Sequence, residues 1–218
     1  MLNEPIYKEV RYMFDEETRE KIRLDDNGLK NVFMIGDSIR IGYCRQVKEN
    51  LKSIANVIYP DENCRNTQYT YVTLSNWIRL VANPLKVDTV YWNNGHWDIS
   101  HWAHDEEPLN TVKQYCNMLL RIHKRLKNTF KNAKIIFATT TPMNPDGSMG
   151  ENVRTTKEIK KYNLAAIRTL EDKGVMIDNL FEFAKGFSSE YYADYCHYTV
   201  EGFKIIADHI SEYLKDIL

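Results

Sequence analysis

Short apolar runs alternate with longer amphipathic stretches along most of the chain. Five runs have the character of buried strands, at Asn31–Ile35, Ala55–Pro60, Val87–Asn93, Ala133–Pro142 and Val175–Asn179. Apolar residues three or four positions apart predict helices after them, at Asp37–Ile54, Tyr69–Ala82, Pro108–Phe130, Thr155–Gly174 and Thr199–Leu218. Because strand and helix alternate five times, the pattern predicts an α/β fold, a three-layer α/β/α sandwich around a five-stranded parallel sheet.

The first 30 residues differ from the rest of the chain because they are polar and densely charged, as in "DEETREKIRLDDNG". We interpret residues 1–30 as a lead-in segment, with a helix on the surface as the expected structure. The remaining residues, 31–218, form one domain of ordinary size, long enough to bury a core without disulfides.

Composition excludes several classes of function. With 43% hydrophobic and 27% charged residues the chain is a folded globular protein, and its net charge of −1 argues against nucleic acid or an anionic membrane surface as partner. No apolar run approaches the roughly 18–20 residues of a membrane span. The N-terminal sequence carries no leader, so we expect a cytoplasmic protein. The four scattered cysteines are expected to be free thiols. The sequence leaves open whether the protein forms a homo-oligomer.

Function in a parallel sheet gathers in the loops after the carboxyl ends of the strands. The first such loop is Gly36-Asp37-Ser38, where a tight turn leads into a helix. A serine at a helix N-terminus lies where unpaired N–H groups favour developing negative charge, as an activated nucleophile needs. The alternative is a plain helix cap, because Asp and Ser both favour that position.

A second pair of polar residues precedes the last predicted helix. Asp194 and His197 are three positions apart in "DYCHYTVEG". This spacing brings a carboxylate beside an imidazole, which then accepts a proton from a hydroxyl group through its other nitrogen. Together with Ser38, the pair indicates nucleophilic catalysis.

On these residues the sequence resembles the SGNH, or GDSL-type, hydrolase superfamily. "GDSIR" is similar to its first block and "DYCHYTVEG" to its last, and the likeness spans the chain from Val32 onward. The resemblance implies a flavodoxin-like topology, Ser38 as nucleophile, His197 as base and Asp194 as the acid that orients it. It also implies that no cofactor is needed.

The middle blocks depart from the family pattern, which makes the oxyanion hole the open part of the site. Besides the Ser38 N–H, the superfamily uses a glycine N–H after strand two, where this chain offers Arg65 or Asn66. It also uses an Asn side chain after strand three, where this chain has Trp97. We expect Asn94 to replace it, with Asn93 as the alternative.

The loop "GHWDISHWAHDEEP" carries aromatic residues and potential metal ligands. Trp97 and Trp102 are expected to contact substrate, by stacking on a sugar ring or lining an acyl pocket; the alternative is that they pack on the core. A zinc site would draw on its histidines and aspartates, namely His96, Asp98, His101, His104 and Asp105, but their spacing matches no metal motif and we assign no metal. Asn93 and Arg40 complete the expected substrate contacts.

The sequence therefore predicts a serine esterase that works through an acyl-enzyme. The expected loops over the site are polar and aromatic, which favours a short acyl group, acetyl above all, on a carbohydrate or another polar alcohol. Lysophospholipase or thioesterase activity is the enzymatic alternative. A catalytically silent binding module on the same fold and a flavin-binding protein are the others, and a flavin site has no use for the Asp194–His197 pair.

Overall fold

The computed structural model describes residues 27–147 and 152–218, so most of the predicted lead-in segment lies outside the described residues. Five parallel strands form one sheet in the order β2-β1-β3-β4-β5. They are β1 (Lys30–Ile35), β2 (Ala55–Ile58), β3 (Thr89–Trp92), β4 (Lys134–Ala138) and β5 (Met176–Asp178). The predicted fold class is confirmed.

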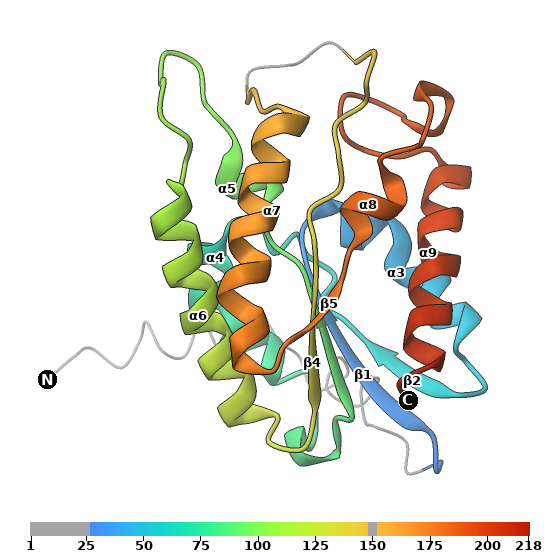
Figure 1. Cartoon of the computed structure of the whole chain (residues 1–218). Coiled ribbons are helices and arrows are strands. Elements are labelled where there is room, and N and C mark those ends of the chain that lie inside the picture. The colour runs from blue at the N-terminus through green and yellow to red at the C-terminus, as the bar shows by residue number, and fades with distance from the viewer. Residues whose placement is uncertain (1–26, 148–151) are drawn as a thin grey trace, which may run out of the picture.

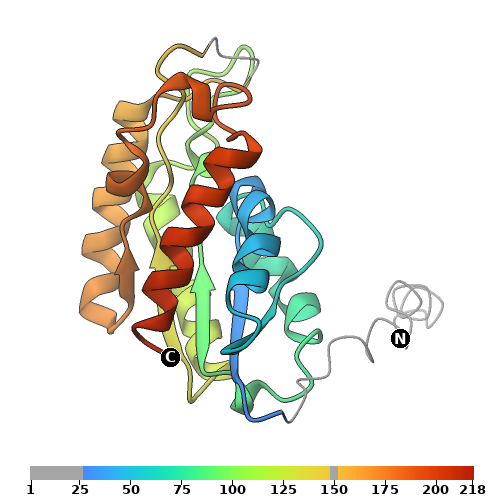
Figure 2. The ribbon, with the colours of Figure 1, turned by 90° about the vertical axis from the view of Figure 1, so that its right-hand side faces the viewer.

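Helices cover both faces of this sheet and make the outer layers of the sandwich (Figures 1 and 2). The helices α4 (Thr67–Ile78), α6 (Val112–Thr129) and α7 (Thr156–Leu170) pack on one face, and α3 (Ser38–Asn50), α8 (Leu180–Ala184) and α9 (Val200–Lys215) on the other. A short α5 (His96–Ile99) follows β3. Single turns of 3₁₀ helix occur at Pro84–Lys86, Glu171–Lys173 and Ser189–Tyr191.

Strand β1 shows why the apolar runs are nearly continuous. Phe33 and Ile35 pack in the core under α4, α6 and α7, whereas Val32 and Met34 pack under α3 and α9. All four side chains have no exposed surface. Since both faces of a parallel sheet are covered, successive positions along a central strand are apolar, and the polar Lys30 and Asn31 lie at the start of β1.

Capping residues set where the helices begin, and these differ from the predicted bounds. Helix α6 begins at Val112 and not at Pro108, because Thr111 and Gln114 form a reciprocal capping box. Helix α7 begins at Thr156, within a second such box formed by Thr155 and Glu158. The short helices α5 and α8 were not predicted, because four or five residues carry too little periodicity to indicate a helix.

All four cysteines are free thiols, as expected, and three of them are buried. None of the helices within residues 27–147 and 152–218 combines the length and the apolar character that a membrane crossing requires.

Gly95, between β3 and α5, is a position where any side chain is excluded. Its φ is +157°, and a Cβ atom there would lie 1.9 Å from Oγ1 of the buried Thr140. We expect Gly95→Ala to lower the free energy of unfolding by about 2–3 kcal/mol through strain and overpacking. Urea denaturation measures this, with Gly186→Ala as the matched control because a Cβ at Gly186 has nothing within 4 Å. Equal midpoints for the two variants would contradict this account of Gly95.

Candidate active site

The carboxyl ends of the strands bring the loop after β1 to the edge of the sheet where the other long loops gather (Figure 1). Ser38 is the first residue of α3, and Asp37 caps that helix by accepting a hydrogen bond from the Ile39 N–H at 3.0 Å. Burial raises the pKa of Asp37, whose second carboxylate oxygen has no partner among the described residues. Asp37 therefore shapes the turn, and the Ser38 hydroxyl is not used to cap the helix.

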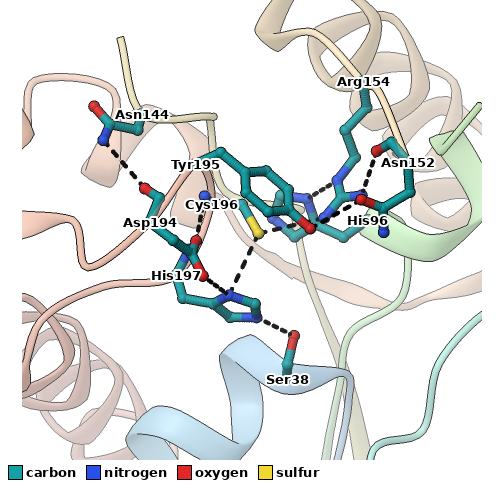
Figure 3. Close-up of polar contacts among 9 residues, drawn as sticks. All are labelled: Ser38, His96, Asn144, Asn152, Arg154, Asp194, Tyr195, Cys196 and His197. Carbon is teal, nitrogen blue, oxygen red and sulfur yellow. Dashed lines mark hydrogen bonds and ion pairs between the residues drawn. The ribbon is translucent and has the colours of Figure 1, made fainter. Parts of the chain in front are cut away.

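Ser38, His197 and Asp194 form a continuous hydrogen-bonded line, although 156 positions separate the serine from the aspartate in sequence (Figure 3). The Ser38 Oγ lies 2.8 Å from Nε2 of His197, and Nδ1 of His197 lies 2.7 Å from Oδ2 of Asp194. This is the order of contacts that a nucleophile, a general base and an orienting acid require.

The charges of this line are set by its immediate neighbours. The Cys196 sulfur and the Asp194 carboxylate, both close to Nδ1, outweigh partial burial and raise the pKa of His197 to about 9. Partial burial of Asp194 acts to raise its pKa, but hydrogen bonds from the His197 and Cys196 backbone and from the His197 ring hold that pKa below its usual value. Asp194 is therefore a carboxylate throughout the neutral range, and it favours the imidazolium form of His197.

The loop that carries Asp194 and His197 is held by the loop after β4. The Asn144 side chain donates to the Asp194 carbonyl at 3.1 Å, and the Asn144 N–H donates to the Tyr195 carbonyl at 2.9 Å. Within the loop, Asp194 Oδ1 accepts the N–H groups of Cys196 and His197 at 2.8 and 2.7 Å. These bonds hold the Asp194 carboxylate in the position from which it contacts the His197 ring.

The structure separates the two asparagines that follow β3. Asn94 is fully buried, and its amide donates both hydrogens, to the Arg65 carbonyl and to Thr70 Oγ1, each at 2.9 Å. Its carbonyl accepts from Trp92 at 2.7 Å, so the expectation that Asn94 is the oxyanion donor is wrong. Asn93 lies beside the turn that carries Ser38 instead, because its Oδ1 accepts from the Asp37 N–H at 3.4 Å. No described residue accepts from its Nδ2, which leaves that group available as a donor.

The loop after β2 lies against the Gly36–Ser38 turn, since the Cys64 N–H donates to the Gly36 carbonyl at 3.1 Å. Arg65 has a left-handed φ of 50°, and its N–H is engaged by Asn63 Oδ1 at 2.8 Å. That bond contradicts Arg65 as an oxyanion donor. The N–H of Asn66 has no hydrogen-bond partner in the described part of the chain, so Asn66 remains the backbone candidate.

Arg40 does not reach the site, and its expected contact with substrate is wrong. The side chain is 1% exposed, and its guanidinium donates to the carbonyls of Pro60, at 2.8 Å, and of Glu62. Arg40 thus clamps α3 to the loop after β2, which is a structural role in positioning the candidate oxyanion loop.

Trp97 and Trp102 form a pair on the loop after β3, with ring centroids 6.4 Å apart. Trp97 is half-buried and faces the Arg65 guanidinium at 6.0 Å, whereas Trp102 is 42% exposed. An exposed aromatic surface next to the Cys64–Asn66 loop supports the expected role in substrate contact, which stays a prediction.

The candidate zinc ligands of the same loop are held in separate networks. Asp98 accepts from Thr67 and Asn110, His96 contacts Thr141 and Arg154, and His101 contacts Glu158. Within the described ranges, the potential metal ligands whose atoms lie within 4.8 Å of one another are Asp194, Cys196 and His197. Because 2.7 Å between Asp194 and His197 is a hydrogen-bond distance, we assign this group to the Ser38 line.

Sequence reasoning missed Arg154 and Cys196. The Cys196 sulfur lies next to the His197 ring on the side away from Ser38, and Arg154 lies beyond the sulfur (Figure 3). Arg154 follows β4 by 16 positions and Cys196 adjoins His197 in sequence, yet one nitrogen of the guanidinium lies 3.3 Å from the sulfur. A thiol next to the base was visible in "DYCH", but nothing in the pattern indicated that an arginine would meet it.

No protein-family profile matches the sequence, and no curated protein matches it either.

Solved structures match closely in shape but distantly in sequence. A protein from Streptococcus pneumonia named for platelet activating factor has a TM-score of 0.70 at 19% identity, covering 96% of each chain. The acetyl xylan esterase AlAXEase has a TM-score of 0.67 at 16% identity, covering 84% of this chain and 98% of its own. A lipase/acylhydrolase from Enterococcus faecalis has a TM-score of 0.66 at 18% identity, covering 86% and 96%. The chain therefore has the fold of these lipases, acylhydrolases and esterases.

Proposed function

We propose that this protein is a serine ester hydrolase that acts through an acyl-enzyme. The observation that carries the proposal is the hydrogen-bonded line from Ser38 Oγ through His197 to Asp194. The names of the structural neighbours, which include esterases and acylhydrolases, point in the same direction.

Each step follows from the arrangement of the side chains. The Ser38 oxygen attacks the ester carbonyl while Nε2 of His197 takes its proton, and Asp194 stabilises the resulting imidazolium. The Ser38 N–H, the Asn66 N–H and the Asn93 amide bind the oxyanion. His197 then gives the proton to the leaving alcohol, and a water molecule activated by the same nitrogen releases the acid.

We further propose a short acyl group, acetyl above all, on a carbohydrate or a similar polar alcohol. The exposed ring of Trp102 beside Trp97 supports this choice, because aromatic faces stack on sugar rings and the site has polar loops around it. One neighbour is named an acetyl xylan esterase, which is consistent with such a substrate.

Hydrolysis of p-nitrophenyl acetate and p-nitrophenyl octanoate tests both levels of the proposal. We expect faster turnover of acetate, which Ser38→Ala removes. A preference for octanoate would keep the mechanism and favour a lysophospholipase or thioesterase. Equal background rates from both proteins, with acetylated xylo-oligosaccharides also left intact, would favour a silent binding module.

The pH dependence of kcat/KM is a further prediction. Only neutral imidazole accepts the Ser38 proton, and the pKa of His197 is raised to about 9. The rate should therefore rise with pH through an ascending limb centred near 9, and kcat/KM at pH 7 should be about one-hundredth of its plateau. Initial rates in matched buffers from about pH 6 to about pH 10 measure the ascending limb of kcat/KM. A limb centred near the ordinary value for histidine would contradict this assignment of charges.

A further inference from the structure

Arg154 is a buried cation that lacks a carboxylate partner among the described residues. Arg154 is 5% exposed, and its Nε donates to Nδ1 of His96 at 3.2 Å. Its other groups donate to the Asn152 carbonyl at 3.0 Å and to the Cys196 sulfur at 3.3 Å. The Tyr195 ring covers it at 5.3 Å. Because a buried charge is costly unless its donors are satisfied, each of these neutral acceptors matters.

His96 can serve only as an acceptor toward Arg154. Burial and the nearby guanidinium lower the pKa of His96 well below its usual value, so the ring is neutral. Its Nε2 lies 3.2 Å from Thr141 Oγ1 and carries the proton, which leaves the Nδ1 lone pair for Arg154. His96 and Asn152 therefore fix the guanidinium, and the fixed guanidinium points one nitrogen at Cys196.

The Cys196 sulfur lies between Arg154 and the catalytic base. It is 1% exposed, and besides the arginine it contacts Nδ1 of His197 at 3.7 Å. An arginine nitrogen is always a donor, and Nδ1 carries a hydrogen whenever Nε2 accepts from Ser38. The Nδ1 hydrogen itself goes to Asp194 at 2.7 Å, so the sulfur accepts from Arg154 and lies 3.7 Å from the nitrogen where positive charge appears during catalysis.

We propose that Arg154 and Cys196 are positioning residues that form a second support for His197, in parallel with Asp194. Arg154 fixes the sulfur, and the sulfur stabilises the imidazolium at Nδ1. This inference rests on the proposed function, because it gives the two residues a role only if His197 acts as a base.

The two supports differ in their surroundings, which explains why both are useful. The Asp194 side chain is 43% exposed, so water screens its attraction for the imidazolium. The Cys196 sulfur is buried, so its partial negative charge, although smaller than the full charge of Asp194, acts in a medium of lower dielectric constant.

Titration of the His197 ring by NMR tests the inference without any assay of activity. The parent is Ser38→Ala, to which Cys196→Ala or Cys196→Ser is added. Removal of the sulfur takes away a stabiliser of the imidazolium and exposes the ring to the Arg154 charge, so both effects lower the pKa. We expect a fall of at least about one unit for Cys196→Ala and a smaller fall for Cys196→Ser. Cys116→Ala, on the half-buried side of α6, is the matched control and should leave the titration unchanged.

Arg154→Lys tests the role of Arg154 in this second support for His197. Lysine keeps the charge but lacks the planar guanidinium that reaches His96 and Cys196 together. We expect the pKa of His197 to fall in this variant as well. Added to Cys196→Ala, it should cause no further fall, since both changes remove one support. Additive shifts, or an unchanged titration in Cys196→Ala and Cys196→Ser, would overturn the inference. Such a result would leave the proposed function intact. Failure of the proposed function would show instead as ester hydrolysis that Ser38→Ala does not change.

Discussion

Replacement of Ser38 by alanine is expected to lower kcat for ester hydrolysis by about 10⁶-fold. Loss of the nucleophile in a serine–histidine–aspartate enzyme has an effect of about that size, because the remaining groups have nothing to activate. The residual rate would come from the oxyanion donors and from binding alone.

The same change should leave the fold intact, which makes the result interpretable. The Ser38 hydroxyl bonds only to His197 among the described residues, and Asp37, not Ser38, caps α3. We therefore expect an unfolding midpoint close to that of the wild type. Ser75→Ala is the matched control, because Ser75 is exposed on α4 and bonds to Arg125. Retention of most activity in Ser38→Ala would rule out the proposed mechanism.

Replacement of Asn93 by alanine is expected to lower kcat by about 10²–10³-fold, with KM changed much less. The reason is that an oxyanion donor acts mainly in the transition state, so its loss appears in kcat. Steady-state kinetics on p-nitrophenyl acetate measure both constants. The expectation depends on the free Nδ2 of Asn93 beside the Asp37–Ser38 turn.

Asn94→Ala separates this role from a purely structural one. The Asn94 side chain makes two buried hydrogen bonds, with Trp92 in β3 and Thr70 in α4. A third, part-buried bond joins it to the Arg65 carbonyl in the loop after β2. Its loss leaves buried groups unsatisfied, so we expect about 2–4 kcal/mol lower stability in urea denaturation. If Asn94→Ala kept full stability and lost kcat while Asn93→Ala kept both, the two roles would have to be exchanged.

The fold was largely predictable because local signals and global packing agree. The apolar run of β1 packs toward both faces of the sheet, as a central parallel strand must. Helix α4 formed despite its β-branched residues, because Asn66 caps it and its Leu74 and Trp77 bury one face. Tertiary packing outweighs intrinsic propensity there.

The candidate site was predictable only where its residues lie in local motifs. Ser38, Asp194 and His197 each follow or precede a helix start in a recognisable block, and the structure brings them into one line. The positions of Asn93, Asn94 and Arg40 depend on which distant loop each side chain meets, and sequence spacing does not encode that. Arg154 was missed for the same reason, since its partners His96, Tyr195 and Cys196 come from two distant segments of the chain.

The most direct test of the central claim is covalent labelling of Ser38. The protein would be incubated at alkaline pH with diethyl p-nitrophenyl phosphate, then digested and analysed by mass spectrometry. The account predicts one diethylphosphoryl group on Ser38, slower labelling in His197→Ala, and none at this position in Ser38→Ala. A protein that stays unlabelled, or that carries the group on another residue, would contradict the assignment of Ser38 as the nucleophile.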